Sequence, residues 1–136
     1  SIEKGIYHYR STAKKNFSQY LCGPQVKLKK YLYVLRPLLA VRWLERYGEV
    51  APIEFGVLRQ VLDDATVQAA IDDLLVLKRQ SSELATQATV AVLQAWIQAE
   101  LERLTQYAGI TGHADPIIWP SLNTIFAQQL AAQCQR

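Results

Sequence analysis

The sequence predicts an all-α fold: a single compact bundle of five or six helices around a central, proline-kinked second helix. Two observations predict it. Apolar residues recur at steps of three and four rather than in alternation, and Gly, Pro and Ser breaks divide the chain into segments of helical length. The 136 residues are 50% hydrophobic and 20% charged, an ordinary composition for one domain with a buried core. We therefore take residues 1–136 as one helical domain, without a strand ladder.

The first two helices are expected at residues 3–21 and 25–47. Gly23 and Pro24 end the first, because glycine suits the position after a helix and proline cannot continue it. The second ends at Gly48 and is apolar on nearly every side, which is typical of a helix surrounded by others.

Pro37 lies deep inside this second helix. A proline there lacks the N–H that would bond to the carbonyl of Tyr33 and clashes with that turn, at a cost of about 3 kcal/mol. We expect a kink, and a Tyr33 carbonyl that is free for another donor.

The remaining helices are marked by caps and prolines. Pro52 suits a first turn, and the pair Asp63 and Asp64 can cap the helix after it. The expected helices are 52–62, 65–80, 86–108 and a last one that starts at Pro116 or Pro120 and reaches about residue 134.

The expected cellular location follows from two sequence features that are not found, a membrane span and a signal peptide. The chain has no apolar run near the roughly 20 residues of a membrane span and no signal peptide, so we expect no membrane association and a cytoplasmic location. The only cysteines, Cys22 and Cys134, are therefore expected to be reduced thiols. The chain begins at Ser1 and contains no methionine, which favours a fragment of a longer protein.

The net charge of +3 hides a strong asymmetry. Residues 1–46 carry ten Lys and Arg against two acidic residues, a balance of +8, whereas residues 47–136 carry five against ten, a balance of −5. The first third could attract the phosphates of a nucleotide or RNA, or it could be a solvated surface that complements the acidic remainder.

Basic residues on the second helix are the first candidates for binding. Lys29 and Arg36 are seven residues apart and point the same way, with Tyr33 between them. Arg36 and Arg42 lie among leucines, so each guanidinium needs an acceptor, either a carboxylate within the bundle or a ligand phosphate.

A second basic and aromatic group lies on the first helix. It could stack on bases and contact phosphates, or its aromatic residues could be core and its lysines solvated. Its members are Tyr7, His8, Tyr9, Arg10, Lys14 and Lys15.

No catalytic or metal-binding group stands out. Two histidines, His8 and His113, are too few for a histidine-based metal site, and the acidic pairs 63–64 and 72–73 fit caps and solvated surface better than Mg²⁺ ligands. No glycine-rich phosphate loop and no triad spacing is present.

The segment 26–45, VKLKKYLYVLRPLLAVRWLE, resembles the signature helix of a bacterial family of predicted nucleotidyltransferases in the DNA polymerase β superfamily, a group linked to RNA repair. HYRSTAKKN at 8–16, APIEF at 51–55 and DLLVLK at 73–78 are similar to the family's flanking segments, so the resemblance covers about residues 6–105.

The resemblance implies a two-part enzyme. Its N-terminal palm-like domain carries a Gly-Ser turn and an Asp-x-Asp pair that hold Mg²⁺ and a nucleoside triphosphate. This chain has neither motif. It is therefore interpreted as the C-terminal helical half, an accessory to its own N-terminal catalytic domain, or as a stand-alone relative; whether it is itself an enzyme stays open.

The resemblance also ranks the binding residues. It implies that residues of the second helix face the nucleotide or RNA cleft, on one open face with basic residues of the first helix. The candidates are Lys29, Lys30, Tyr33, Arg36 and Arg42, then Lys78, with His8, Lys14 and Lys15 weaker.

Two other functions are alternatives for this sequence. One is a structural or dimerising module without a ligand. The other is a HEPN-like RNase, for which Arg103 and His113 are too widely spaced. The nucleotide, the acceptor and the oligomeric state do not follow from the sequence. Removal of a partner domain would expose an apolar patch.

Overall fold

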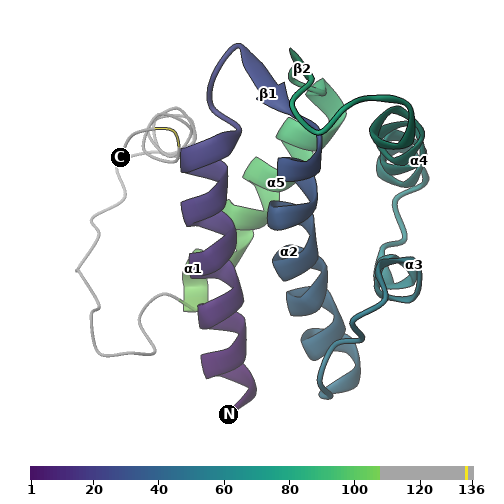
Figure 1. Cartoon of the computed structure of the whole chain (residues 1–136). Helices are drawn as coiled ribbons and strands as arrows, with labels where there is room; N and C mark the ends of the chain where they lie inside the picture. Colours follow the sequence, from purple (N-terminus) through teal and green to yellow (C-terminus); the bar gives the residue numbers. More distant parts are fainter. Residues whose placement is uncertain (108–133, 135–136) are drawn as a thin grey trace.

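The computed structural model describes residues 1–107 and residue 134. In this part of the chain five α-helices and one small sheet form a compact bundle, which confirms the predicted all-α class. Helices α1 (Ile2–Tyr20) and α2 (Lys29–Tyr47) lie side by side and run in opposite directions (Figure 1). Helix α5 (Ala91–Arg103) crosses behind them, and α3 and α4 lie beside α2 (Figure 1). None of the described helices is long and apolar enough to cross a membrane.

Helix α1 begins and ends close to where the sequence predicts. The Ser1 hydroxyl accepts a hydrogen bond from the Lys4 amide at 3.3 Å, which caps the first turn. The buried face includes Ile6, Ala13 and Phe17, which have at most 2% of their surface exposed.

Helix α2 is the central helix, as predicted. Tyr31, Leu35 and Leu39 are fully buried, and the helix contacts α1, α3 and α5. It ends at Gly48, whose φ of 67° is the left-handed conformation that favours glycine. The predicted start at residue 25 is wrong, because α2 begins only at Lys29.

A short two-stranded sheet precedes α2 and α5, and the expectation of no strand is wrong. Strand β1 (Gln25–Lys27) pairs antiparallel with β2 (Thr86–Ala88), with Val26 opposite Gln87. Three residues are too few to show the alternation of a strand, so helical periodicity appeared to continue through both segments. The pairing also explains why α5 begins at Ala91 rather than at residue 86.

The segment between α2 and α5 wraps beside α2. It contains α3 (Phe55–Leu58), the 3₁₀ turn η1 (Arg59–Val61) and α4 (Ala65–Gln80). The predicted helix 52–62 is thus shorter than expected and tightens into a 3₁₀ turn. The predicted helix 65–80 is confirmed, and Asp64 caps it by accepting from the amides of Thr66 and Val67.

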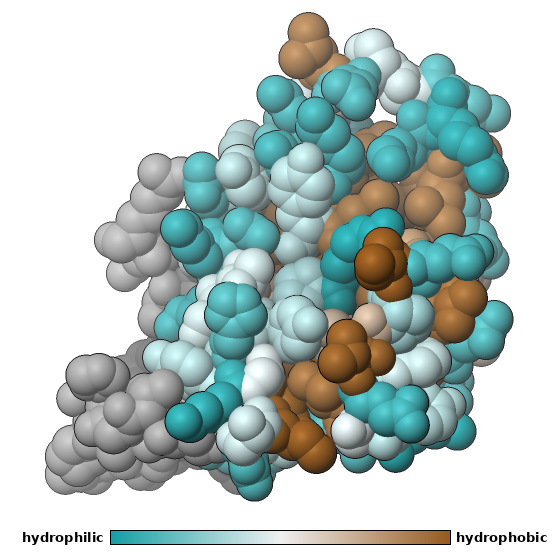
Figure 2. Space-filling view, turned by 60° about the horizontal axis from the view of Figure 1, so that its bottom comes forward, coloured by the Kyte–Doolittle hydropathy of each residue, from teal (hydrophilic) through white to brown (hydrophobic). Residues whose placement is uncertain are grey.

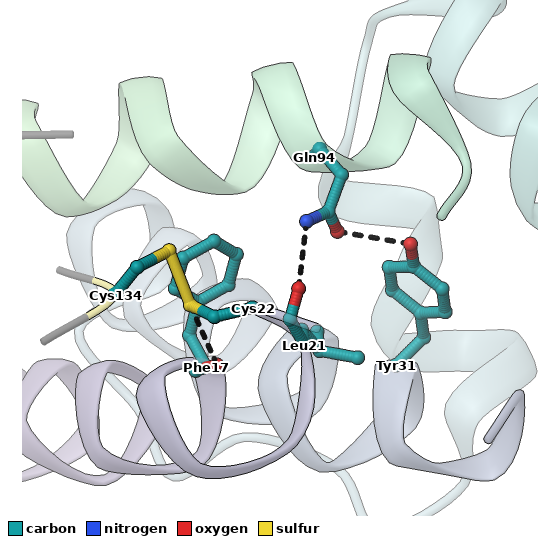
Figure 3. The surroundings of a disulfide bond; sticks show 6 residues. All are labelled: Phe17, Leu21, Cys22, Tyr31, Gln94 and Cys134. Carbon is teal, nitrogen blue, oxygen red and sulfur yellow. Dashed lines mark hydrogen bonds between the residues drawn. A yellow bond between two sulfur atoms is a disulfide. The ribbon is translucent and has the colours of Figure 1, made fainter. Parts of the chain in front are cut away.

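Two polar networks fix α5 against its neighbours. The Tyr31 hydroxyl donates to Gln94 Oε1 at 2.9 Å, and Gln94 Nε2 donates to the Leu21 carbonyl at 2.9 Å (Figure 3). The same hydroxyl accepts from the Val90 amide at 2.8 Å. Toward its other end, Glu100 accepts from Arg42 and Arg103. Burial raises the pKa of Tyr31, because the phenolate would lose its hydration. The 3₁₀ turn η2 (Leu104–Tyr107) follows α5.

Cys22 and Cys134 form a disulfide, so the expectation of two reduced thiols is wrong (Figure 3). Their Cα atoms are 5.4 Å apart although 112 residues separate them in sequence. Neither that separation nor the missing signal peptide shows which residues the fold brings together. The helix predicted from Pro116 or Pro120 lies outside the described residues, apart from position 134.

Candidate phosphate-binding face

Helices α1 and α2 share a surface on the side away from α5, visible at the front of Figure 1. We call it the α1–α2 face. On α1 its residues recur every four positions, and on α2 every three, as expected for one stripe of each helix. They are His8, Thr12, Asn16 and Tyr20 of α1 with Lys30, Tyr33 and Arg36 of α2.

Two tyrosines and a lysine form the middle of the α1–α2 face. The rings of Tyr20 and Tyr33 meet edge to face with centroids 6.3 Å apart, and 44% of Tyr33 is exposed. Lys30 Nζ lies 4.1 Å from the Tyr20 centroid and 4.6 Å from that of Tyr33. Such cation–π contacts are worth about 0.5–1 kcal/mol at exposed sites. They hold the ammonium in place without neutralising its charge.

Pro37 shapes the same face through the backbone. As predicted, the Tyr33 carbonyl finds another donor, because Asn16 Nδ2 donates to it at 3.1 Å. This bond ties α1 to α2 beside the exposed Tyr33 ring.

Arg36 lies at the end of the face that is nearer α3. Its Nη1 donates to the Ile53 carbonyl at 2.8 Å, and its guanidinium carbon lies 5.3 Å from the Phe55 ring centroid. Both contacts fix the guanidinium at the mouth of a pocket of about 310 Å³. The pocket is lined by His8, Tyr9, Thr12, Arg36, Pro37, Ala40, Ala51, Pro52, Ile53 and Leu58.

Five cations elsewhere in the described residues are matched with carboxylates. Arg42 binds Glu100, Lys29 lies 3.5 Å from Glu83, and three further arginines follow the same pattern. These are Arg59 with Asp72, Arg46 with Asp63, and Arg103 with Glu45 and Glu100. Lys30 and Arg36 have no carboxylate within 4.0 Å among residues 1–107 and 134, and the same is true of other basic residues such as Lys15, Lys78 and Arg79.

Of the two acceptors expected for Arg42, the structure shows the carboxylate within the bundle, Glu100. Burial favours the neutral form of Glu100, but hydrogen bonds from Arg42 and Arg103 outweigh it, so the pKa of Glu100 is lowered. The hydrogen bonds that Arg103 donates to Glu45 raise the pKa of Arg103. This network joins α2 to α5, away from the α1–α2 face. A phosphate role for Arg42 stays a prediction.

Lys29 and Lys78 meet in a second, smaller pocket. It measures about 110 Å³ and is also lined by Leu28, Ser81, Ser82 and Glu83. The predicted candidates therefore fall into three places. Lys30, Tyr33, Arg36 and His8 share the α1–α2 face, Lys29 and Lys78 share this second pocket, and Arg42 lies in the α2–α5 network.

The weaker basic candidates of α1 separate as well. Lys15 is exposed, whereas Lys14 is half-buried, and burial followed by the nearby charge of Arg10 lowers the pKa of Lys14. Arg10 itself is buried and donates to the Leu101 carbonyl at 3.2 Å. Arg10 is therefore part of the packing between α1 and α5.

Some residues of the face were not among the predicted candidates. Thr12, Asn16 and Tyr20 are uncharged, but their four-residue spacing from His8 is a signal that could have found them. The contribution of Ile53 had no such signal, since it depends on the path of the loop before α3.

The Mg²⁺ ions implied by the family have no fitting ligands in this part of the chain. Residues 1–107 and 134 contain no group of three or more His, Cys, Asp or Glu side chains placed to hold a metal. The described residues thus supply cations, hydroxyls and aromatic rings, which suit phosphates and bases.

Comparison with known proteins identifies the family to which the chain belongs. The RlaP family, described as the RNA repair pathway DNA polymerase beta family, matches residues 1–128. The chain is 39% identical over 107 residues to "Uncharacterized protein YcgL" of Bacillus subtilis (strain 168), an alignment that covers 78% of this chain. It spans only 41% of that relative's length. No solved structure matches. The extent of the first match shows that the chain belongs to the RlaP family, the RNA repair pathway DNA polymerase beta family.

Proposed function

We propose that this chain is the helical C-terminal part of a nucleotidyltransferase, and that its α1–α2 face binds phosphates of a nucleotide or of an RNA acceptor. Nucleotidyl transfer itself, with its Mg²⁺ and triphosphate, belongs in this proposal to a separate palm-like domain. The family description, an RNA repair pathway with a DNA polymerase beta relationship, supports this division of labour. So does the match to less than half of a longer relative.

One observation carries the binding proposal. Lys30 and Arg36 lie on one face without a carboxylate within 4.0 Å among the described residues, and aromatic rings or a carbonyl hold each of them. A cation held by rings and a carbonyl is already oriented, so binding of a phosphate requires little further ordering. The exposed Tyr33 ring adds a surface on which a base can stack, worth about 1–3 kcal/mol per base in other proteins.

The experiment is a titration of the 136-residue chain with a short single-stranded RNA at two salt concentrations. We expect salt-sensitive binding that weakens in both Lys30→Ala and Arg36→Ala, because each removes one phosphate contact. Arg79→Ala is the matched control, since Arg79 is an exposed arginine at the end of α4, on a different element. Equal losses in Arg79→Ala and Arg36→Ala would show non-specific attraction to a basic protein and would contradict the proposal.

A further inference from the structure

The pocket beside Arg36 has the make-up of a small-molecule site rather than of a flat electrostatic surface. Its walls come from three separated segments: α1, the middle of α2, and the loop and helix around α3. Most of the lining is apolar, with Pro37, Ala40 and Leu58 largely buried. Its volume of about 310 Å³ is at the lower end of ligand pockets, which are roughly 300–1,000 Å³.

The polar groups of the pocket are few. Arg36 and His8 bring nitrogen donors from α2 and α1, and Thr12 adds a hydroxyl. Of the five N–H groups of Arg36, one is used on the Ile53 carbonyl. No hydrogen bond from the others is found to residues 1–107 or 134. The planar fork is thus held by one contact and offers its remaining donors to an oxyanion.

The apolar lining and the polar donors of the pocket fit a ligand that has one apolar part and one anionic part. The donors fit a compact oxyanion with several acceptor oxygens. The apolar wall fits a flat ring that buries its faces, because such surfaces exclude water from a ring and offer it no hydrogen bonds. A phosphate alone would leave the apolar wall unused, and an apolar molecule alone would leave the Arg36 donors unused.

We propose that the pocket holds a single nucleotide unit, with its phosphate monoester on Arg36 and His8 and its base against Pro37, Ala40 and Leu58. The proposal rests on the proposed function and narrows it, because it separates a pocket for one nucleotide from the rest of the α1–α2 face. Lys30 and Tyr33 then contact the neighbouring part of a longer ligand. The same chemistry is carried by a free mononucleotide and by the phosphorylated end of an RNA strand.

The test is calorimetric titration of the 136-residue chain with AMP, adenosine and inorganic phosphate. We expect AMP to bind at least tenfold more tightly than either part alone, with one molecule per chain. Arg36→Ala should weaken AMP binding about tenfold or more, because it removes a charge-assisted contact to phosphate. Arg79→Ala, on a different element, should change AMP binding less than threefold.

Two further variants keep the test decisive if Arg36→Ala is poorly folded. Arg36→Lys retains the charge but loses the planar fork, so it should recover only part of the affinity. Ala51→Leu adds volume at a partly exposed part of the lining and should weaken AMP and adenosine more than phosphate. Circular dichroism checks that each variant keeps its helical content.

The outcomes separate this proposal from the broader one. Phosphate binding as tight as AMP binding, or AMP binding that Arg36→Ala leaves unchanged, overturns the pocket proposal. RNA binding that depends on Lys30 and Arg36 without any AMP binding also overturns it, unless a 5′-phosphorylated RNA binds at least tenfold more tightly than its 5′-hydroxyl form. Such a preference assigns the pocket to a strand end, and AMP binding assigns it to a free nucleotide. No binding of AMP or RNA overturns both proposals.

Discussion

The side-chain amide of Asn16 donates to the main-chain carbonyl of Tyr33 at 3.1 Å, and this carbonyl is the one that Pro37 leaves without its usual helical donor. The turn of α2 that contains Pro37 is thereby joined to α1. We expect Asn16→Ala to lower the free energy of unfolding by about 0.5–1.5 kcal/mol, the usual net value of one hydrogen bond. Urea denaturation measures it.

A double-mutant cycle tests the cause. In a Pro37→Ala background the residue at position 37 has an N–H that can bond to Tyr33, so the loss caused by Asn16→Ala should shrink. An unchanged loss in that background would mean that Asn16 acts by packing alone. Gln19→Ala is the control on α1, because Gln19 is exposed and lies outside the α1–α2 face.

The fold was predictable wherever one short segment contained the whole signal. Asp64 capping residues 65–80 is such a case, and so is the carbonyl freed by Pro37. Strand β1 was missed because its partner, β2, lies about sixty residues further on. The disulfide was missed for the same reason, since its two cysteines meet only in the folded chain.

The buried Tyr31 hydroxyl joins three parts of the fold. Tyr31→Phe should destabilise the chain by about 1–3 kcal/mol, because the Val90 amide would lose its acceptor and Gln94 its donor. Tyr33→Phe removes the same atom from a tyrosine that is 44% exposed and should change stability by less than about 0.5 kcal/mol. Guanidinium denaturation of both variants measures the contrast, and equal effects would argue against the network.

Glu100 is the buried carboxylate between two arginines. Glu100→Gln should lower the free energy of unfolding by about 2–3 kcal/mol, a value reduced from that of a fully buried pair because Arg42 and Arg103 are each about one-third exposed. Glu83→Gln breaks the exposed pair with Lys29 and should cost less than about 0.5 kcal/mol. A small effect at Glu100 would mean that its two arginines are readily solvated.

The lowered pKa of Glu100 also predicts how the free energy of unfolding depends on pH. The unfolded chain takes up this proton near the ordinary value of 4.5 and the folded chain only at lower pH, so protons favour unfolding in that range. The stability difference between the parent chain and Glu100→Gln should be constant above about pH 5 and shrink below it. Burial raises the pKa of Glu102, which works in the opposite direction in both proteins and cancels in the difference. A difference that grows on acidification would contradict this assignment.

The grouping of residues in the candidate site was predictable in part. Helical spacing on α2 identified Tyr33 and Arg36, which do lie on one face with Lys30. It could not tell that Arg42 would meet Glu100, because the two are 58 residues apart in sequence. Long-range packing determines which cations pair with carboxylates of the same chain. It therefore also determines which cations have no such partner.

The Cys22–Cys134 disulfide predicts a chemical result. Without a reductant, the denatured chain should take up no alkylating reagent, and after reduction it should take up two equivalents, as read by intact mass. Reduction should also lower the midpoint of thermal unfolding, since closing a loop of this length stabilises other proteins by up to about 5 kcal/mol. Cys134→Ser should reproduce the reduced protein, and alkylation before reduction would contradict the bond.

Three polar contacts join α2 to α5, and their residue numbers increase along both helices. They are Tyr31 with Gln94, Arg42 with Glu100, and Glu45 with Arg103. The two helices therefore run in the same general direction, although they cross, and their peptide dipoles partly add instead of cancelling. α1 runs the other way and offsets one of them (Figure 1). Each helix end carries about half a charge, so the negative ends of α2 and α5 gather where Arg46 and Arg103 occupy the last turns.

The positive ends of the α2 and α5 dipoles lie at the β1–β2 sheet, beside Lys27 and Lys29. The electrostatic field of the two dipoles there adds to the field of these side-chain charges. The opposite end of the bundle, where α1 begins and the α2–α3 loop turns, carries hydrophobic side chains at its surface; these include Val50 and Ile53, which are 87% and 91% exposed (Figure 2). The backbone of α2 and α5 therefore favours negative charge at the sheet end of the bundle, next to Lys27 and Lys29, and positive charge at the other end.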